Sequence, residues 1–181
     1  MKMPNTRLYL DTEFTKLGPI HSEAKLISIG LITEDGESTF YSELTDGYDF
    51  EDCSVFVKET VLPLLDAPVL PEVIDYQVIY ARMTTEQTRT LLKVWLEQFS
   101  SYVVMCSDAI AHDGHFIDTL FAGYPWPKNL ETKLDTCVPT NNLRRVHKFF
   151  QNTEDIFLKG EYRRHHALDD AKVMRLAALG A

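Results

Sequence analysis

Residues 7–14 read RLYLDTEF, and residues 25–33 read KLISIGLIT. The first run begins apolar and ends in acids, and the second is rich in Ile and Leu, so each predicts a β-strand. Asp35 and Gly36 follow the second run and favour a tight hairpin turn. The next segment, ESTFYSEL at residues 37–44, predicts a third strand. Three strands joined in this way predict an antiparallel meander at the start of the chain.

The rest of the chain alternates between helical and extended patterns. Residues 54–65 predict a helix that Pro63 should end or kink, and Thr84 with Gln87 forms a capping-box pattern that opens another helix. The remaining predictions are a loop over 66–83, a buried strand over 102–106, a helix from about residue 113, a short strand over 134–137, and helices over 141–151 and 167–179. This order predicts a mixed α/β sheet with helices on its faces.

Length and composition predict one soluble globular domain spanning residues 1–181. Hydrophobic residues make up 45% and charged residues 25% of the chain, an ordinary balance for such a domain. No apolar run approaches the ~20 residues that cross a bilayer, and Asp11 comes too early for a signal peptide. We therefore expect a cytoplasmic protein with no membrane partner. The odd count of three cysteines, with no CxxC pair, argues against a disulfide framework or a zinc ribbon.

The net charge of −9 is unusual for a protein that holds long nucleic acid by counterion release. It does not exclude a phosphodiester substrate, because metal ions bound to carboxylates present positive charge locally. The acidity favours short or single-stranded substrates over long duplexes.

Asp11 and Glu13 are the first candidates for a functional site. Alternate residues of a strand point the same way, so the two carboxylates lie side by side. Their repulsion is costly to bury without a counter-charge, which a divalent cation would supply. Alternatively, the two acids could simply mark a solvent-exposed strand end, because a DxE sequence alone is common in proteins.

The segment HHALDDA at residues 165–171 is the second candidate. Asp169 or Asp170 could serve only to cap a helix, because acids are favourable in a first helical turn. Alternatively, Asp170 binds a metal ion while His165 accepts a proton from a water molecule, a task that suits the near-neutral pKa of histidine.

A third candidate lies in SDAIAHDGHFIDTLF at residues 107–121, directly after a buried strand. Asp113 falls near the start of the predicted helix and Asp118 later on it. Either acid could join the other carboxylates, and either could be an ordinary surface residue.

The order of these motifs resembles the DEDDh exonucleases, the group that includes oligoribonuclease and RNase T. Their motifs are a DxE pair, a mid-chain Asp and H-x(4)-D near the C-terminus. The resemblance spans Asp11 to Asp170, and DTEF with LISIG and EDG is particularly similar to a small bacterial and phage branch. It implies an RNase H-like fold, with a mixed five-stranded sheet whose first three strands are antiparallel, flanked by helices.

The resemblance also implies roles for residues. The metal ligands for two Mg²⁺ or Mn²⁺ ions would be Asp11, Glu13, Asp113 and Asp170, with Asp113 favoured over Asp118 as the mid-chain acid, and the general base would be His165. Residues that pack against the terminal nucleotide would be Phe14, Thr15 and Leu17, with Lys16 departing from the Gly of many relatives. The expected reaction is 3'→5' hydrolysis of single-stranded or short nucleic acid, with RNA slightly favoured over DNA. Several relatives are homodimers, so the resemblance implies a possible homodimer, although the sequence does not identify an interface.

Three other hypotheses compete with this one. An inactive RNase H-like binding module has little reason to retain all four acids and the histidine. An HD-type phosphohydrolase would use His112 and Asp113 on a helical bundle, which the strand-rich N-terminus disfavours. A zinc protein would have to use ligands that lack an established spacing: Cys106, His112, His115 and Cys137.

Overall fold

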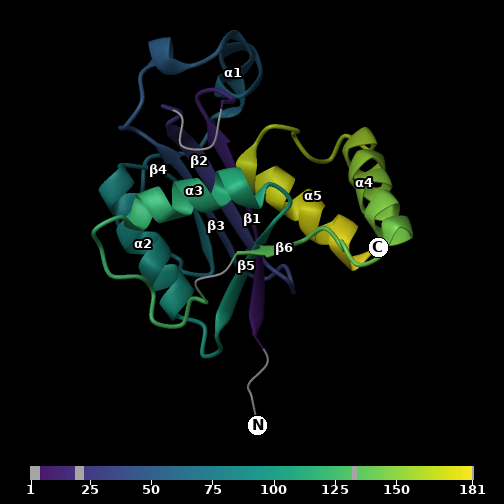
Figure 1. Cartoon of the computed structure of the whole chain (residues 1–181). Helices are drawn as coiled ribbons and strands as arrows, with labels where there is room; N and C mark the ends of the chain where they lie inside the picture. The colour runs from purple at the N-terminus through teal and green to yellow at the C-terminus, as the bar shows by residue number, and fades with distance from the viewer. Residues whose placement is uncertain (1–4, 19–22, 132–133, 181) are drawn as a thin grey trace.

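A mixed β-sheet with helices on both faces forms the centre of the computed structural model, which describes residues 5–18, 23–131 and 134–180 (Figure 1). The strand order is β4-β3-β2-β1-β5-β6. The strands are β1 (Thr6–Phe14), β2 (Leu26–Thr33), β3 (Thr39–Leu44), β4 (Val78–Met83), β5 (Val103–Ser107) and β6 (Asp135–Thr136). Strands β1 to β3 pair antiparallel, and the other pairings are parallel. The α/β class and the antiparallel meander are therefore confirmed.

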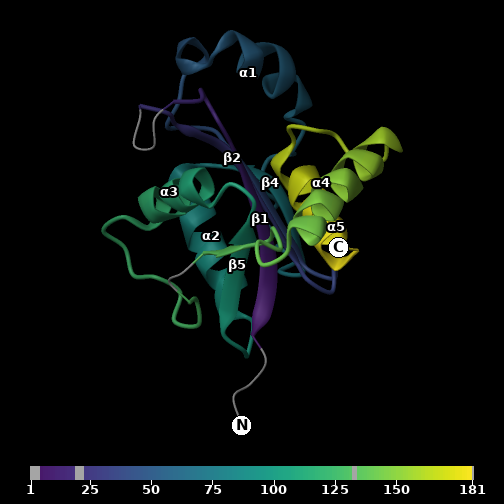
Figure 2. The same cartoon turned by 45° about the vertical axis from the view of Figure 1, so that its right-hand side comes forward.

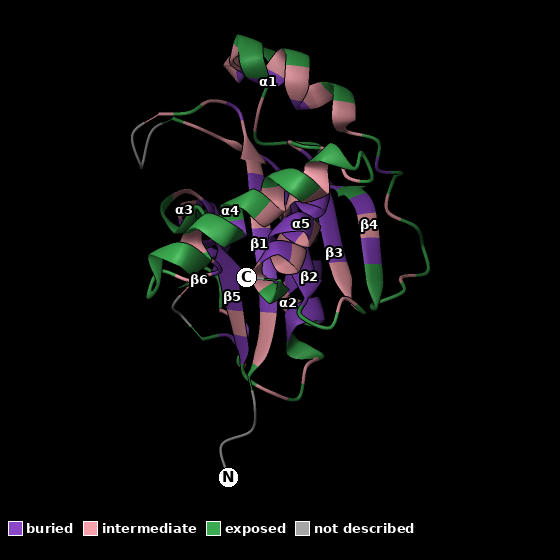
Figure 3. Cartoon of the chain, turned by 90° about the vertical axis from the view of Figure 1, so that its right-hand side faces the viewer, coloured by how far each residue is buried: buried purple, intermediate pink, exposed green. Residues whose placement is uncertain are grey.

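The helices form two layers. Their bounds are η1 (Phe50–Asp52), α1 (Val55–Thr60), η2 (Leu62–Leu64), α2 (Thr85–Glu97), α3 (Ile110–Phe121), α4 (Leu143–Leu158) and α5 (Ala167–Leu179). Helices α2 and α3 cover one face of the sheet and α4 and α5 the other, while α1 lies beyond one end of the strands (Figures 1 and 2). The strands are mostly buried between these layers, and the helices expose their outer sides (Figure 3).

The sheet has six strands rather than five, because β4 lies in the segment predicted as a loop. Its residues alternate between exposed or half-buried and buried positions, and it pairs in parallel with β3 at the edge of the sheet. The outward positions Val78 and Tyr80 are themselves apolar or aromatic, which hides the period of two in the sequence. Two nearby prolines, Pro68 and Pro71, further suggested a loop.

Local signals place several helix ends. The Thr84 hydroxyl accepts a hydrogen bond from the Gln87 amide at 3.2 Å, and the Gln87 side chain accepts one from the Thr84 amide at 2.9 Å. This capping box opens α2 as predicted. Helix α1 ends at Thr60, and Pro63 lies in the short 3₁₀ turn that follows. Helix α3 begins at Ile110, slightly earlier than expected.

A close approach of α5 to β2 depends on Gly30. A Cβ atom added at Gly30 would lie 2.4 Å from the backbone nitrogen of Leu168 and 2.5 Å from the carbonyl carbon of Ala167. Gly30 pairs with Asp11 across the sheet. The absence of a side chain at Gly30 therefore allows the first turn of α5 to lie beside the acids of β1.

No helix in the described ranges is long and apolar enough to cross a membrane.

Candidate metal centre

Three elements, β1, α3 and α5, together with the loop before α5, bring the predicted site residues to one end of the strands. Asp11 and Glu13 lie on the same side of β1, and a register irregularity with β2 follows directly after Glu13. Asp113 lies in the first turn of α3 and Asp170 in the first turn of α5. Because β1 and β5 run parallel, the chain leaving β5 into α3 starts at the same end of the strands as the acids of β1.

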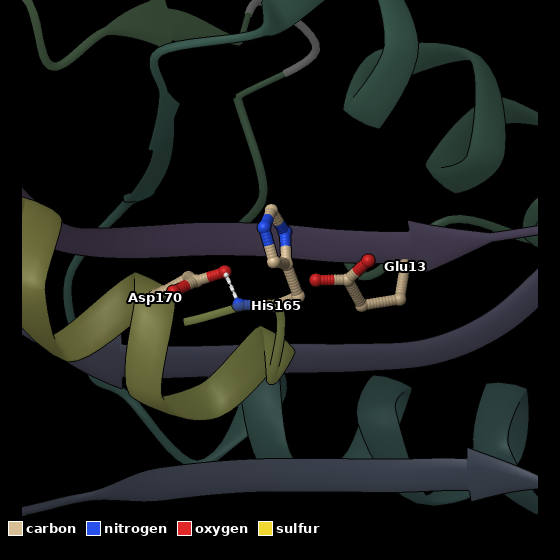
Figure 4. A group of neighbouring side chains, drawn as sticks. All are labelled: Glu13, His165 and Asp170. Carbon is tan, nitrogen blue, oxygen red and sulfur yellow. Dashed lines mark hydrogen bonds between the residues drawn. The ribbon is translucent and has the colours of Figure 1, made fainter. Parts of the chain in front are cut away.

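Glu13, His165 and Asp170 form one group that could hold a metal ion (Figure 4). One ligand atom from each lies within 4.8 Å of the others. The backbone amide of His165 donates a hydrogen bond to Asp170 Oδ2 at 2.9 Å. The other oxygen, Asp170 Oδ1, is buried without a hydrogen-bond partner among the described residues. A buried carboxylate oxygen without a donor is costly, and a cation would satisfy it.

Asp11, Asp108 and Asp113 form a second group with the same spacing. Asp113 is 2% exposed, and its Oδ1 accepts a hydrogen bond from the Thr12 hydroxyl at 2.5 Å. Its Oδ2 accepts one from the Ser107 hydroxyl. Asp118 is exposed on α3 and belongs to neither group. The structure thus brings Asp113, and not Asp118, to the other acids.

Asp108 is a carboxylate in this group that sequence reasoning missed. It directly follows β5, the place where sites gather in such sheets, and this position was the available signal. Asp108 is exposed to solvent. Its carboxylate nevertheless lies close enough to Asp11 and Asp170 to raise the pKa of both by charge repulsion.

Burial raises the pKa of every acid in the centre, and repulsion from neighbouring carboxylates raises it further for Asp11, Glu13, Asp113 and Asp170. Burial is the largest cause for each, and it raises the pKa of Glu13 to about 8, of Asp170 to about 7 and of Asp113 to about 6. For Asp11, burial and the charges of its neighbours, first Asp113, raise the pKa well above its ordinary value. The protein holds these acids together against their repulsion, which is the electrostatic character of a cation site.

His165 occupies an unusual backbone conformation next to these acids. Its φ is +67°, a left-handed value rarely adopted by residues other than glycine. Its ring lies edge-on to Phe56 of α1, with ring centroids 5.1 Å apart. Burial, and secondarily the charge of Arg164, lowers the pKa of His165. The ring is thereby kept neutral near pH 7 and can accept a proton.

The residues predicted to meet a substrate lie at the end of β1 and just beyond it. Phe14 stacks on His112 and Phe116 of α3, with ring centroids 5.6 Å and 5.0 Å apart. Leu17 is 80% exposed. Thr15 is fully buried, and its hydroxyl accepts a hydrogen bond from the Lys25 amide at 3.0 Å, so it joins the chain just after β1 to the chain just before β2.

A third group of possible ligands, Glu43, Asp66 and His166, differs from the first two. Arg163 donates a hydrogen bond to Asp66 at 2.8 Å, and its Nη2 lies 3.0 Å from His166 Nε2. Glu43 accepts two backbone hydrogen bonds, each of 2.8 Å, and lies 3.5 Å from Arg82. Glu43 Oε2 is buried without a hydrogen-bond partner among the described residues, but it lies 3.5 Å from Arg82 Nε. Because a protein cation already lies against each of the three side chains, we interpret the group as a structural network.

Two competing hypotheses do not fit the described structure. The strand-rich sheet is not the helical bundle of an HD-type phosphohydrolase. Cys106 and Cys137 are buried thiols, and none of the three possible ligand groups among the described residues includes them.

The sequence matches no protein-family model and no curated protein. A solved structure does match in fold: the nuclease domain of 3'hExo, described as a DEDDh family member, bound to rAMP. The TM-score is 0.60 and the identity 17%, and the match covers 97% of this chain and 90% of that chain. The chain therefore shares the RNase H-like fold of a DEDDh nuclease domain over nearly its whole length.

Proposed function

We propose that this chain is a single-domain DEDDh-type 3'→5' exonuclease, active on single-stranded or short nucleic acid and favouring RNA over DNA. The observation that carries the proposal is the convergence of Asp11, Glu13, Asp113, Asp170 and His165 at one end of the strands. These residues lie in three separate elements and the loop before α5, and the DEDDh pattern requires the same five types in the same order.

The residues present fit a pair of divalent cations. All the carboxylates offer hard oxygen ligands, which select Mg²⁺ or Mn²⁺ over zinc. Asp170 Oδ1 is buried without a donor among the described residues, and the acids have raised pKa values. Asp11, Glu13 and Asp170 would hold one ion, and Asp11 with Asp113 the other. When bound, such ions would activate a water molecule and stabilise the attacking and leaving oxygens of a phosphodiester.

The protein's own groups would orient the reaction. His165 accepts the proton of the attacking water, with its neutral ring held beside Glu13 and Asp170. Thr12 and Ser107 hold the Asp113 carboxylate in one orientation by donating to both of its oxygens. Phe14, from the strand end, and the exposed Leu17 contact the terminal nucleotide, and Thr15 supports their loop.

The substrate class rests on charge and on the fold comparison. A net charge of −9 disfavours long duplexes held by phosphate contacts. The structural neighbour was solved with a ribonucleotide, which supports the preference for RNA. A cytoplasmic location and a homodimer stay predictions from the sequence and the resemblance.

A degradation ladder tests the proposal. Purified protein is incubated with 5'-labelled single-stranded RNA and DNA of matched sequence, with Mg²⁺, Mn²⁺ or EDTA. The matched control is Asp11→Asn, which removes one charge at the shared ligand. We expect metal-dependent shortening from the 3' end, faster on RNA, and no shortening with the control.

The possible outcomes separate the alternatives. Metal binding without product on either polymer would favour an inactive nucleic-acid-binding module of the same fold. Equal activity of Asp11→Asn and the unaltered protein would remove Asp11 from the centre and overturn the proposed mechanism.

A further inference from the structure

The conformation of His165 requires an explanation beyond the metal centre. His165 is the one non-glycine residue with positive φ in the described ranges. Nothing in its side chain favours that conformation strongly, so the chain on either side must impose it. The neighbouring residues 163, 164 and 166 are each held by contacts to other elements.

Arg163 makes the densest set of these contacts. Its backbone amide and its Nε both donate to Asp169 Oδ2, at 3.3 Å and 2.8 Å. Its Nη1 donates to Asp66 Oδ2 at 2.8 Å, and its Nη2 lies 3.0 Å from His166 Nε2. One guanidinium therefore joins the segment before His165, the first turn of α5 and the loop after η2.

His166 fixes the chain on the other side. It is 1% exposed, and its Nδ1 accepts a hydrogen bond from the Asp169 amide at 3.3 Å, which caps α5. Its ring packs against Tyr41, with centroids 4.5 Å apart. Arg164 is held separately, by a 2.8 Å ion pair with Glu154 of α4.

We infer that the Arg163–Asp169 ion pair is a positioning clamp for His165. The pair closes the chain from residue 163 to residue 169 into a loop against α5, and His165 lies between its ends. The left-handed backbone points the His165 amide at Asp170 and its ring at the Glu13 and Asp170 carboxylates. Asp169 thus positions His165, the proposed base, through its ion pair with Arg163, while its neighbour Asp170 lies in the metal centre. The expected effect on kcat rests on the proposed function, whereas the expected effect on the backbone conformation of His165 does not.

The kinetic test is a double-mutant cycle between Arg163→Gln and His165→Ala. We expect Arg163→Gln and Asp169→Asn each to lower kcat by about 10- to 100-fold, because small misplacements of a reacting group cost this much. We expect KM to stay unchanged and Mn²⁺ affinity, measured by titration without substrate, to fall much less than kcat, because the clamp reaches Asp170 only through the His165 amide. In the His165→Ala background, Arg163→Gln should change kcat by no more than about twofold, because the residue acts through His165.

Conservative and control variants sharpen the test. Arg163→Lys keeps the charge but not the fork of donors, so its kcat should fall between those of the unaltered protein and Arg163→Gln. Arg175→Gln removes an arginine of α5 that donates to the Glu34 carbonyl at 2.7 Å, and it should leave kcat unchanged. Multiplicative losses in the double mutant, or a lost Mn²⁺ affinity in Arg163→Gln, would overturn the clamp.

A structural readout separates this inference from the proposed function. A residue with positive φ has a short distance between its amide proton and its Hα, which gives a strong intraresidue NOE. We expect this NOE for His165 in the unaltered protein and in Arg175→Gln, and its loss in Arg163→Gln. Its persistence in Arg163→Gln would refute the clamp even if the protein proved to have no nuclease activity.

Discussion

At the scale of single residues, His165 combines a neutral ring, a left-handed backbone and closeness to two carboxylates. If it is the general base, His165→Ala should lower kcat by roughly 10²–10⁴-fold, the usual contribution of such a group. Single-turnover hydrolysis of a 5'-labelled oligonucleotide would measure the loss.

The matched control is His147→Ala, which removes an exposed histidine of α4. Mn²⁺ affinity should be similar in both variants. A His165→Ala protein with full activity would show that another group takes the proton.

The two candidate mid-chain acids offer a second test at this scale. Asp113 is buried beside Asp11 and accepts hydrogen bonds from two hydroxyls, whereas Asp118 is exposed. We expect Asp113→Asn to lower turnover by about 10- to 100-fold, because substitutions of residues that support a metal site commonly reduce activity by this factor. We expect Asp118→Asn to retain full activity. Steady-state kinetics with saturating Mg²⁺ would compare them, and the reverse order would move the site to Asp118.

At the scale of elements, the approach of α5 to β2 decides whether Asp170 reaches Asp11. An added Cβ at Gly30 meets backbone atoms of α5, which cannot move aside as a flexible side chain can. Gly30→Ala should therefore destabilise the fold by about 1–3 kcal/mol, the usual cost of overpacking. It should also weaken metal binding by displacing Asp170. Urea unfolding and Mn²⁺ titration would measure the two effects.

Gly180→Ala is the control for this prediction. Its added Cβ would meet a side-chain nitrogen of Asn152 at 3.1 Å and backbone no nearer than 3.5 Å, at the end of α5. We expect little change in either measurement. An equally stable Gly30→Ala protein would show that α5 can shift without cost.

Local signals predicted most elements but not their contacts. The acidic end of β1, the Thr84 capping box and the break at Pro63 each depend on neighbouring residues, and the structure shows all three. Strand β4 was missed because apolar side chains on its outward side mask the alternation. Its assignment depends on pairing with β3, a contact that no local window contains.

At the scale of the whole molecule, the clustered acids should make stability depend on pH and on metal. In the folded protein without metal, the pKa of Glu13 rises from 4.5 to about 8 and that of Asp170 from 3.8 to about 7. A raised folded pKa means that the folded state binds more protons than the unfolded state. The resulting stability is present at low pH and is lost as pH rises through these values.

We therefore expect the Tm in EDTA to fall between pH 6.5 and about 8. His166, whose pKa is lowered to about 4 chiefly by burial, opposes this trend only slightly, because half of the unfolded rings are still protonated at pH 6.5 and the ring is neutral in both states by pH 8. Mg²⁺ or Mn²⁺ should restore more stability at pH 8 than at pH 6.5, because metal binding requires deprotonated ligands. Differential scanning fluorimetry would measure both trends. Asp11→Asn should flatten them, and a pH-independent Tm in EDTA would contradict the electrostatic account.

The meander, the starts of α1, α2 and α5, and the order of acids and histidine that resembles the DEDDh pattern could all be predicted from the sequence alone. These depend on side-chain type and on neighbours a few positions away, which the sequence states directly. Three contacts became visible only in the folded structure: Asp113 lies beside Asp11, Asp108 lies in the same group, and Asp169 pairs with Arg163. Each of these depends on where α3 and α5 pack on the sheet. That packing follows from close contacts such as Gly30 against Leu168, between residues far apart in the chain.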